Sequence, residues 1–537
     1  MGNTRLLILL SCFAFFSGIS NAAEKPAIYL GRETSSLEQQ AAVELQRFLY
    51  EASGTLLEIK NEAVLDEDAA GFVLGTPDTL PEVGPAWPFG LEPPVNDGYV
   101  LHAVRPDNGL VAIASPTPRG VLNGVFGLLE KLGFGFYPSG AAVPETPLHI
   151  SRLDVPDLHE SRSPMFEVRG PLPWFTSLCG ASTWSPADYK AYIDCLVHMR
   201  CNFIGFHVSD VDPFAAYAYD GQTAAGQPLP NTSRPGRWAR PVATSRFLAG
   251  VGEYYPGEVF GAPSSFIEDR AASIQQAKRD LHEALAYAKT RGLAVGLGFE
   301  IRGDAFDPVE QERFEVRLNT LLTEYPMLDY VWLWEPETFS AHPPSEPAWR
   351  SVWDSYVRRW ADNFSDVGDP RRSAEAVRLT AYALQARRIL EAVRPDVRLV
   401  VSGWASRPEL AFTDFHAGMD RLLPSDVVFA ALDNAPAAPV VNGKYGTLSP
   451  ERRQWPILWL EIDGDLWMPQ PNLHEVAAAC RDARGKGCQG VFGIHWRTRD
   501  IDLSAGYWAS FAWEPDLTVE EYCAQYARNI YGTERGP

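Results

Sequence analysis

The sequence has little cysteine and lacks the motifs by which metals and nucleotides are most often bound. It contains seven cysteines in 537 residues, without a C-x-x-C pair, an H-E-x-x-H motif or a glycine-rich loop of the P-loop type. At this density a disulfide scaffold is excluded, which leaves room for one or two bridges at most. The sequence therefore lacks the basic elements of zinc sites, metalloproteases and nucleotide-binding proteins, and we expect no cofactor.

A second long hydrophobic run is also missing. The one present, LLILLSCFAFFSGIS, follows Arg5 and ends in small residues at positions 20–23. This pattern is typical of a secretory signal over residues 1–23, with the processed chain starting near Glu24. The run is short for a bilayer span, and acylation of Cys12 as a lipoprotein is the alternative. The sequence predicts an exported protein, periplasmic or extracellular, with no membrane span.

An excess of positive charge is the third absence. Lysine and arginine number 47 against 68 acidic residues, which gives a net charge of −21. This balance argues against nucleic acid or an anionic membrane as partner. Aromatic residues, in contrast, are abundant, with 16 Trp, 20 Tyr and 27 Phe. Most are expected in the core, but aromatic rings in a cleft stack on sugars, so a carbohydrate is the partner to consider. The oligomeric state is not indicated.

Two architectures follow each other along the chain. Residues 24–155 alternate strands and two helices, which predicts a small α/β sheet domain. Residues 156–537 repeat a strand-then-helix pattern, which predicts a (β/α)₈ TIM barrel. The strands are near-continuous apolar runs, as in parallel sheets buried on both faces. The eight candidates are Cys201–His207, Phe247–Glu253, Gly292–Glu300, Tyr330–Glu335, Val397–Trp404, Asp426–Leu432, Pro456–Glu461 and Gly490–Trp496.

Polar residues stand at the ends of most of these strands. In TIM barrels, catalytic groups occupy the C-terminal ends of the strands, so these side chains are expected to converge on one mouth. A single polar residue there could equally be an ordinary solvated strand end, but seven together favour a site. They are His207, Glu253, Glu300, Glu335, Asp433, Glu461 and His495.

Several carboxylates among aromatic rings, without metal or nucleotide motifs, suit glycosidic cleavage. One carboxylic acid protonates the leaving oxygen, and a second stabilises the cationic centre or activates water. Glu335 and Glu337 are equal candidates for the acid, because the apolar neighbours Trp332, Trp334 and Pro336 raise a carboxyl pKa. Side chains alternate along a strand, so only one of the two is expected to be chemical. Glu461 is the best partner, followed by Asp463, Glu300 and Asp433.

The segment from PMFEVRG to CNFIGFHVSD resembles the start of the barrel in family 20 glycoside hydrolases, the β-N-acetylhexosaminidases. The resemblance implies that Arg169 grips sugar hydroxyls at the bottom of the pocket, and that His207 and Asp210 are polar residues of the first strand. The stretch PTPRGVLNGVFGLLEKLGFGFYP is similar to the N-terminal domain that those enzymes share with family 67 α-glucuronidases. Family 20 has an adjacent Asp-Glu at strand four, where this chain has Trp334-Glu335 and Pro336-Glu337.

The stretch HWRTRDID at residues 495–502 adds His495, Trp496 and Arg497 near the end of the last strand. Arginine suits a sugar carboxylate, and Trp496, like Trp404, offers a stacking face. The alternative is an Arg-Asp network that ties down the last loop.

The sequence thus predicts an exported glycoside hydrolase, exo-acting on a glycan that contains uronic acid or amino sugar. A non-catalytic carbohydrate-binding barrel would keep Arg169, Trp404 and Trp496 without the acid-base pair. A polysaccharide lyase, with His495 as base and Arg497 as charge neutraliser, is the third alternative.

Overall fold

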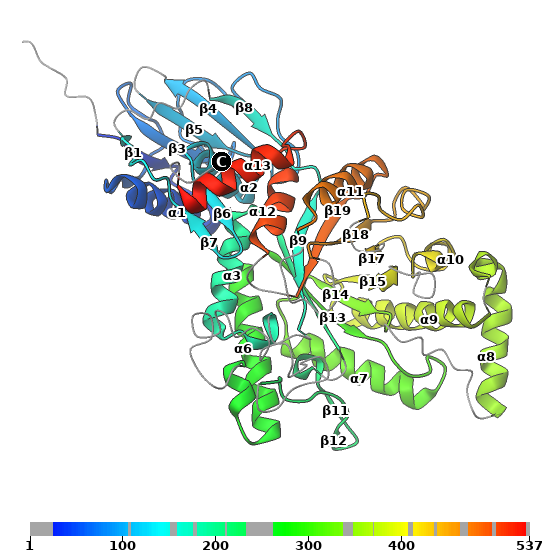
Figure 1. Cartoon of the computed structure of the whole chain (residues 1–537). Coiled ribbons are helices and arrows are strands. Elements are labelled where there is room, and N and C mark those ends of the chain that lie inside the picture. The colour runs from blue at the N-terminus through cyan, green and yellow to red at the C-terminus, as the bar shows by residue number, and fades with distance from the viewer. Residues whose placement is uncertain are drawn as a thin grey trace, which may run out of the picture.

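The computed structural model describes residues 25–532, apart from 106–108, 151–157, 176–179, 210–211, 232–260, 337–346, 369, 406–411, 434–437, 462–470 and 497–500. The described chain forms a small sheet domain followed by a larger barrel, and its C-terminal helix returns to the sheet domain (Figure 1).

The N-terminal domain is one mixed sheet with two helices on it. Its strand order is β2-β1-β3-β5-β4-β8, parallel from β2 to β5 and antiparallel from β5 to β8. Helix α1 begins at a capping box between Ser35 and Glu38 and ends at Gly54 in the left-handed conformation. The strands are β1 (Ala27–Leu30), β2 (Glu58–Asn61), β3 (Gly71–Gly75), β4 (Tyr99–Arg105), β5 (Leu110–Ala114) and β8 (His159–Arg162), and the helices are α1 (Ser36–Ser53) and α2 (Pro118–Lys131).

The second unit is a nearly closed parallel barrel, as the sequence predicts. Neighbouring strands pair in parallel from β10 around to β19, which pairs with β9. The circuit is completed where the Asn202 amide donates to the Arg169 carbonyl at 2.9 Å and Trp174 bridges to His207. The barrel strands are β9 (Val168–Pro173), β10 (Phe203–Val208), β13 (Ala294–Glu300), β14 (Tyr330–Trp334), β15 (Arg398–Ser402), β17 (Val428–Asp433), β18 (Gln454–Trp459) and β19 (Gly490–His495), with the short β16 (Trp404–Ala405) beside β17.

Helices surround this barrel (Figure 1). Helix α3 (Pro186–His198) begins after the capping box of Ser185. The other helices of the barrel part are α6 (Arg270–Thr290), α7 (Pro308–Glu324), α8 (Pro347–Trp360), α9 (Pro370–Val393), α10 (His416–Leu422), α11 (Leu473–Gly485) and α12 (Asp502–Phe511), and the C-terminal helix beside the sheet domain is α13 (Val519–Tyr531).

One strand differs from the expected set. The predicted strand Phe247–Glu253 lies outside the described residues. Within the described chain, the eight-strand circuit includes Val168–Pro173, which is not among the eight strands predicted from the sequence, although its first residues belong to the stretch that resembles the start of the family 20 barrel. Its sequence VRGPLP contains two prolines, which lack an amide donor and therefore weaken the pattern by which a strand is recognised.

The barrel interior is filled by large side chains rather than left open. Phe203, Tyr330, Trp332, Trp455 and Phe492 contact one another there, and all are at most 8% exposed. Gly298 leaves the room that this packing needs, since a Cβ at that position would lie 2.5 Å from the Cβ of Trp332. The aromatic layer closes the barrel from within, so a site can form only at an end.

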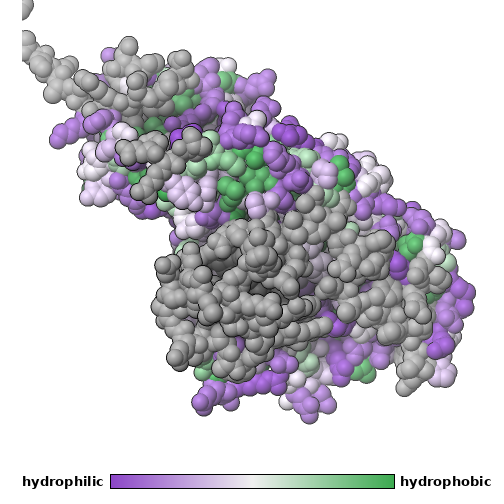
Figure 2. Space-filling model, viewed as in Figure 1, coloured by the Kyte–Doolittle hydropathy of each residue, from purple (hydrophilic) through white to green (hydrophobic). Residues whose placement is uncertain are grey.

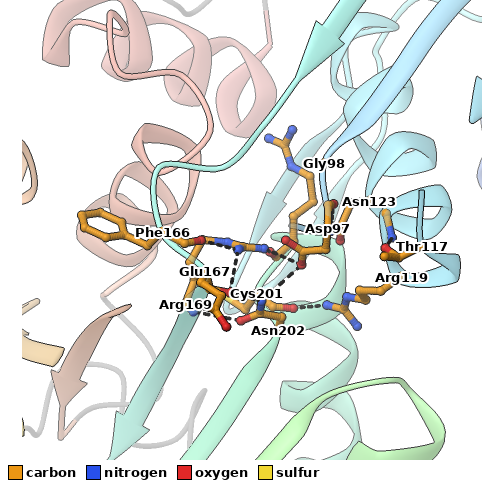
Figure 3. A network of polar contacts seen from close by, with 12 residues as sticks. Asp97, Gly98, Thr117, Arg119, Asn123, Phe166, Glu167, Arg169, Cys201 and Asn202 are labelled. Carbon is orange, nitrogen blue, oxygen red and sulfur yellow. Dashed lines mark hydrogen bonds and ion pairs between the residues drawn. The ribbon is translucent and has the colours of Figure 1, made fainter. Parts of the chain in front are cut away.

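A buried polar network joins the two domains (Figure 3). Asp97 of the sheet domain accepts a hydrogen bond from Arg169 at 2.8 Å, and Arg119 donates to the carbonyls of Arg291, at 2.8 Å, and Cys201. Arg169, Cys201 and Arg291 lie at or just before the beginnings of β9, β10 and β13. The sheet domain is therefore fixed to the N-terminal end of the barrel, and the opposite end carries the candidate site.

Candidate functional site

Five tryptophans and one histidine meet at the C-terminal end of the barrel strands. We name this group the mouth cluster; it consists of Trp174, His207, Trp334, Trp404, Trp459 and Trp496. The ring centroid of Trp174 lies 4.0 Å from that of His207, 5.6 Å from that of Trp334 and 5.7 Å from that of Trp404. Trp459 and Trp496 stack at 5.3 Å. Each ring comes from a different strand, so the cluster spans the barrel axis.

The alternation of side chains explains why these rings gather. Trp332 and Trp334, like Trp455 and Trp459, are separated by even numbers of residues and share the lumen side of their strands. The intervening Val331 and Leu333 face the helices instead. The aromatic mouth is therefore a direct continuation of the barrel core.

His207 is the polar member of this cluster. It is 4% exposed, packs between Trp174 and Trp334, and neither of its ring nitrogens has a hydrogen-bond partner. Burial lowers the pKa of His207 to about 3, so the imidazole is neutral near neutral pH. A neutral imidazole offers one donor and one acceptor, which suits a hydroxyl group.

Two carboxylates approach the mouth from opposite sides. Alternation places Glu300 on the lumen side of β13, in line with Gly296 and Gly298, and places Glu461 in line with Trp459. Strands β13 and β18 are separated by three strands in either direction around the barrel. A ligand above the mouth cluster would therefore have one carboxylate on each side.

The two carboxylates have different neighbours. Arg302 donates to Glu300 Oε2 at 2.6 Å and forms an ion pair with it. Glu461, 2% exposed, accepts a hydrogen bond from the Trp496 amide at 2.6 Å. This bond joins the ends of β18 and β19 and fixes the Glu461 carboxylate beside the mouth cluster.

Glu335 lies on the other face of its strand. Its amide donates to the Ser402 carbonyl at 2.8 Å, and its side chain is 3% exposed with no partner for Oε2. A Cβ at Gly403 would lie 2.8 Å from Oε2 and 2.7 Å from the ring of Phe412, so this glycine leaves the space that the carboxyl occupies. The carboxyl therefore points outward from the lumen.

The environment favours the protonated form of Glu335. Burial and then the neighbouring charge of Glu375 raise its pKa well above the usual value, against the smaller opposing effects of Arg372 and Arg378. Glu375 is itself paired with Arg378, whose Nε donates to it at 2.9 Å. The expectation of an acid with a raised pKa in this stretch therefore agrees with the surroundings of Glu335, although its carboxyl points away from the mouth cluster.

The protonation of Glu335 has a consequence for stability. Its pKa is raised in the folded state, so its contribution to stability is complete below the unfolded value of about 4.3 and is lost as pH rises toward the folded pKa. Glu335→Gln copies the neutral form and should remove this loss. We expect the variant to be more stable than the wild type at neutral pH, with the difference vanishing in acid. Urea unfolding of both proteins over a pH series measures this, and an equal gap at every pH would contradict it.

The structure does not bring every predicted residue to the mouth. Arg169 lies at the opposite end of the barrel, against Asp97, because it occupies the beginning of β9 and not its end. His495 alternates outward toward α3, where the Tyr192 hydroxyl is hydrogen-bonded to its Nε2 at 2.6 Å. Neither can contact a ligand that sits on the mouth cluster. Glu337, Asp210, Arg497, Glu253 and Asp463 lie outside the described residues, and Asp433 is placed only as the last residue of β17.

Two members of the mouth cluster were not anticipated from the sequence. Trp459 precedes Glu461 by two residues in PILWLE, so the period of two could have indicated that both share the lumen side. Trp174 follows the proline-rich β9, whose strand pattern is too weak to direct attention to its end.

Three further observations on the described part of the chain concern its cysteines, groups of metal-ligating side chains and membrane-spanning helices. Cys195, Cys201, Cys480, Cys488 and Cys523 are free thiols. The described residues contain no group of three or more His, Cys, Asp or Glu side chains arranged to hold a metal ion. No helix among them is long and apolar enough to cross a membrane, and the coloured surface in Figure 2 is largely hydrophilic.

Comparisons with known proteins bear on the fold. No protein-family model and no curated protein matches the sequence. Among solved structures, a GH138 enzyme targeting pectin rhamnogalacturonan II matches with a TM-score of 0.54 at 10% identity, over 95% of this chain and 53% of that one. The GH20 β-N-acetylhexosaminidase from Streptomyces coelicolor A3(2) matches with a TM-score of 0.48 at 13% identity, over 95% and 92%. This chain thus spans about half the length of the GH138 enzyme. The predicted resemblance to glycoside hydrolases is confirmed as a likeness of fold, that of a TIM barrel.

Proposed function

We propose that this protein is a glycoside hydrolase that acts at the C-terminal end of its barrel. The observation that carries the proposal is the pair Glu300 and Glu461, directed from opposite strands toward a mouth lined with tryptophan. Aromatic rings bind the apolar face of a sugar, and Glu461 supplies the carboxylate that glycosidic cleavage needs besides a proton donor. The fold likeness to a GH138 enzyme supports the same class.

The roles of the carboxyl groups follow from their surroundings. Glu461, fixed by the Trp496 amide, acts as the carboxylate that stabilises the cationic centre or activates water. The proton donor is Glu335 or Glu337, which follow β14 in the sequence. Burial raises the pKa of Glu335 and favours its protonated form, but its side chain needs a rotation to reach the mouth. His207, neutral and unpartnered, binds a sugar hydroxyl.

For the finer function, we propose exo-action on a glycan that contains uronic acid or amino sugar, by an exported protein cleaved near Glu24. Arg302, 37% exposed beside Glu300, adds a cation near the mouth that suits an acidic sugar. The GH138 enzyme, by its description, targets a pectin. Comparing the turnover of aryl uronides with that of neutral and N-acetylated glycosides tests the substrate class, and a preference for neutral sugars would reject it.

Turnover on a panel of aryl glycosides and glycan oligosaccharides tests the proposed activity itself. The variants Glu335→Gln, Glu337→Gln and Glu461→Gln identify the groups involved, and Glu58→Gln, at an exposed position of β2, is the matched control. Activity lost in Glu461→Gln and in one of the other two, but kept in the control, supports the proposal.

A carbohydrate-binding barrel without hydrolysis is the second candidate, because the Glu335 carboxyl faces away from the mouth cluster. Sugar binding without turnover, unchanged in all the glutamine variants, would favour it. The lyase alternative loses support, since His495, its proposed base, is directed toward Tyr192 and not toward the mouth.

A further inference from the structure

A pair of histidines lies on the N-terminal sheet, in the other domain from the proposed active site. His102 of β4 and His159 of β8 are directly opposite each other in the antiparallel register. Their Nδ1 atoms are 3.0 Å apart, and their ring centroids are 4.9 Å apart. The two imidazoles therefore bring nitrogens of the same type within hydrogen-bond distance of each other.

The surroundings hold this pair in place while leaving it accessible. The ring of Phe89 stacks on His102, with centroids 5.0 Å apart and planes at 25°. The Ala103 amide donates to the Leu158 carbonyl at 2.7 Å and so fixes the two strands next to the pair. Strand β8 is the edge of its sheet, and His159 is exposed there. A solute can reach the nitrogens without any rearrangement of the fold.

The spacing fits a shared transition-metal ion. Imidazole nitrogens bind such ions at about 2.0–2.1 Å, so two of them on one ion, at angles from square to tetrahedral, lie about 2.9–3.4 Å apart. The separation of 3.0 Å falls in this range. Imidazole is a preferred ligand of Cu²⁺, Ni²⁺ and Zn²⁺, whereas Mg²⁺ and Ca²⁺ prefer oxygen.

Metal ions bind the neutral form of imidazole, so metal binding at this pair should weaken in acid. In the present hydrogen bond one Nδ1 carries a proton, and metal binding would move that proton to Nε2 of the same ring.

We propose that His102 and His159 form a surface site for one divalent transition-metal ion, with water completing the coordination. This site is independent of the proposed glycosidase activity. Because β4 and β8 each contribute one ligand, a bound ion would tie the edge strand to its sheet just before the chain enters the barrel. Bound metal should therefore stabilise the folded protein by an amount that grows with the logarithm of the metal concentration above the dissociation constant.

Calorimetric titration of the full chain with CuCl₂ and NiCl₂ near neutral pH tests the proposal. We expect one ion per chain and a raised Tm. Loss of even an outer-shell partner weakens metal affinity about 10–100-fold, so His102→Gln or His159→Gln should weaken it by at least about tenfold. His474→Gln, at an exposed histidine of α11, is the matched control and should bind as the wild type does.

Three results would overturn the site. They are no binding to the wild type, equal binding in the His159→Gln variant, and a loss of binding in the control as large as that in the His102→Gln variant. Circular dichroism of the variants without metal shows whether they are folded. Since His159 is exposed on an edge strand, His159→Gln is expected to fold normally and to keep the experiment decisive.

Discussion

Replacing Glu461 by glutamine is expected to reduce turnover of the preferred glycoside by about 10²–10⁴-fold, the usual contribution of a positioned acid or base. Glutamine has nearly the same shape, and its carbonyl oxygen can still accept the hydrogen bond that Glu461 now receives from the Trp496 amide at 2.6 Å. The variant should therefore fold and bind sugar while it lacks the negative charge that the transition state requires. Steady-state kinetics with binding measured separately by calorimetry provide the check.

Glu300→Gln serves as a second probe of the same mouth. It removes one charge from the ion pair with Arg302 and so changes electrostatics on the opposite strand. If Glu461 is the chemical group, its variant should lose kcat with little change in binding, whereas the Glu300 variant should mainly change KM. The assignment of Glu461 fails if its variant keeps wild-type kcat, or if loss of kcat is accompanied by loss of the folded state.

The fold was predictable because its periodic signals are strong. Apolar runs such as those of β13 and β14 indicate buried parallel strands, and the cap at Ser185 marks the start of α3. The strand β9 was not recognised, since two prolines interrupt its pattern. Residues Val168–Pro173 form a strand because they pair with β19 and so close the barrel, an interaction that the local sequence does not reveal.

The candidate site was only partly predictable. Strand ends are visible in a sequence, but the face on which a terminal side chain emerges depends on register. Glu461 follows Trp459 on the lumen side, while Glu335 and His495 emerge one residue out of phase and face the helices. A polar residue at a strand end therefore indicates a site only weakly, unless it lies an even number of residues from a side chain that faces the lumen.

The position of Arg169 was also not predictable from the sequence, because it lies at the beginning of its strand and not at the end. Its replacement should have the largest effect on stability. Its guanidinium is 2% exposed, pairs with Asp97 at 2.8 Å and lies 4.9 Å from the ring of Trp513. Arg169→Met removes the ion-pair partner of Asp97 and leaves this buried carboxylate with the Asn202 amide at 3.2 Å and the charge of Arg119, which costs about 3–5 kcal/mol. Urea unfolding should record this loss. KM should be unchanged in the fraction that stays folded, because the residue lies at the opposite end of the barrel from the mouth cluster.

The double variant Arg169→Met/Asp97→Asn separates the two roles considered for this arginine. Although burial alone would raise the pKa of Asp97, the charge and hydrogen bond of Arg169 hold it below the usual value. That contribution to stability is present above the unfolded pKa of about 3.9 and is lost as pH falls. Without the carboxylate, no charge is left unpaired, so the double variant should be more stable than Arg169→Met at neutral pH. A raised KM in a fully stable Arg169→Met protein would instead support the sugar-binding role that the family resemblance implies.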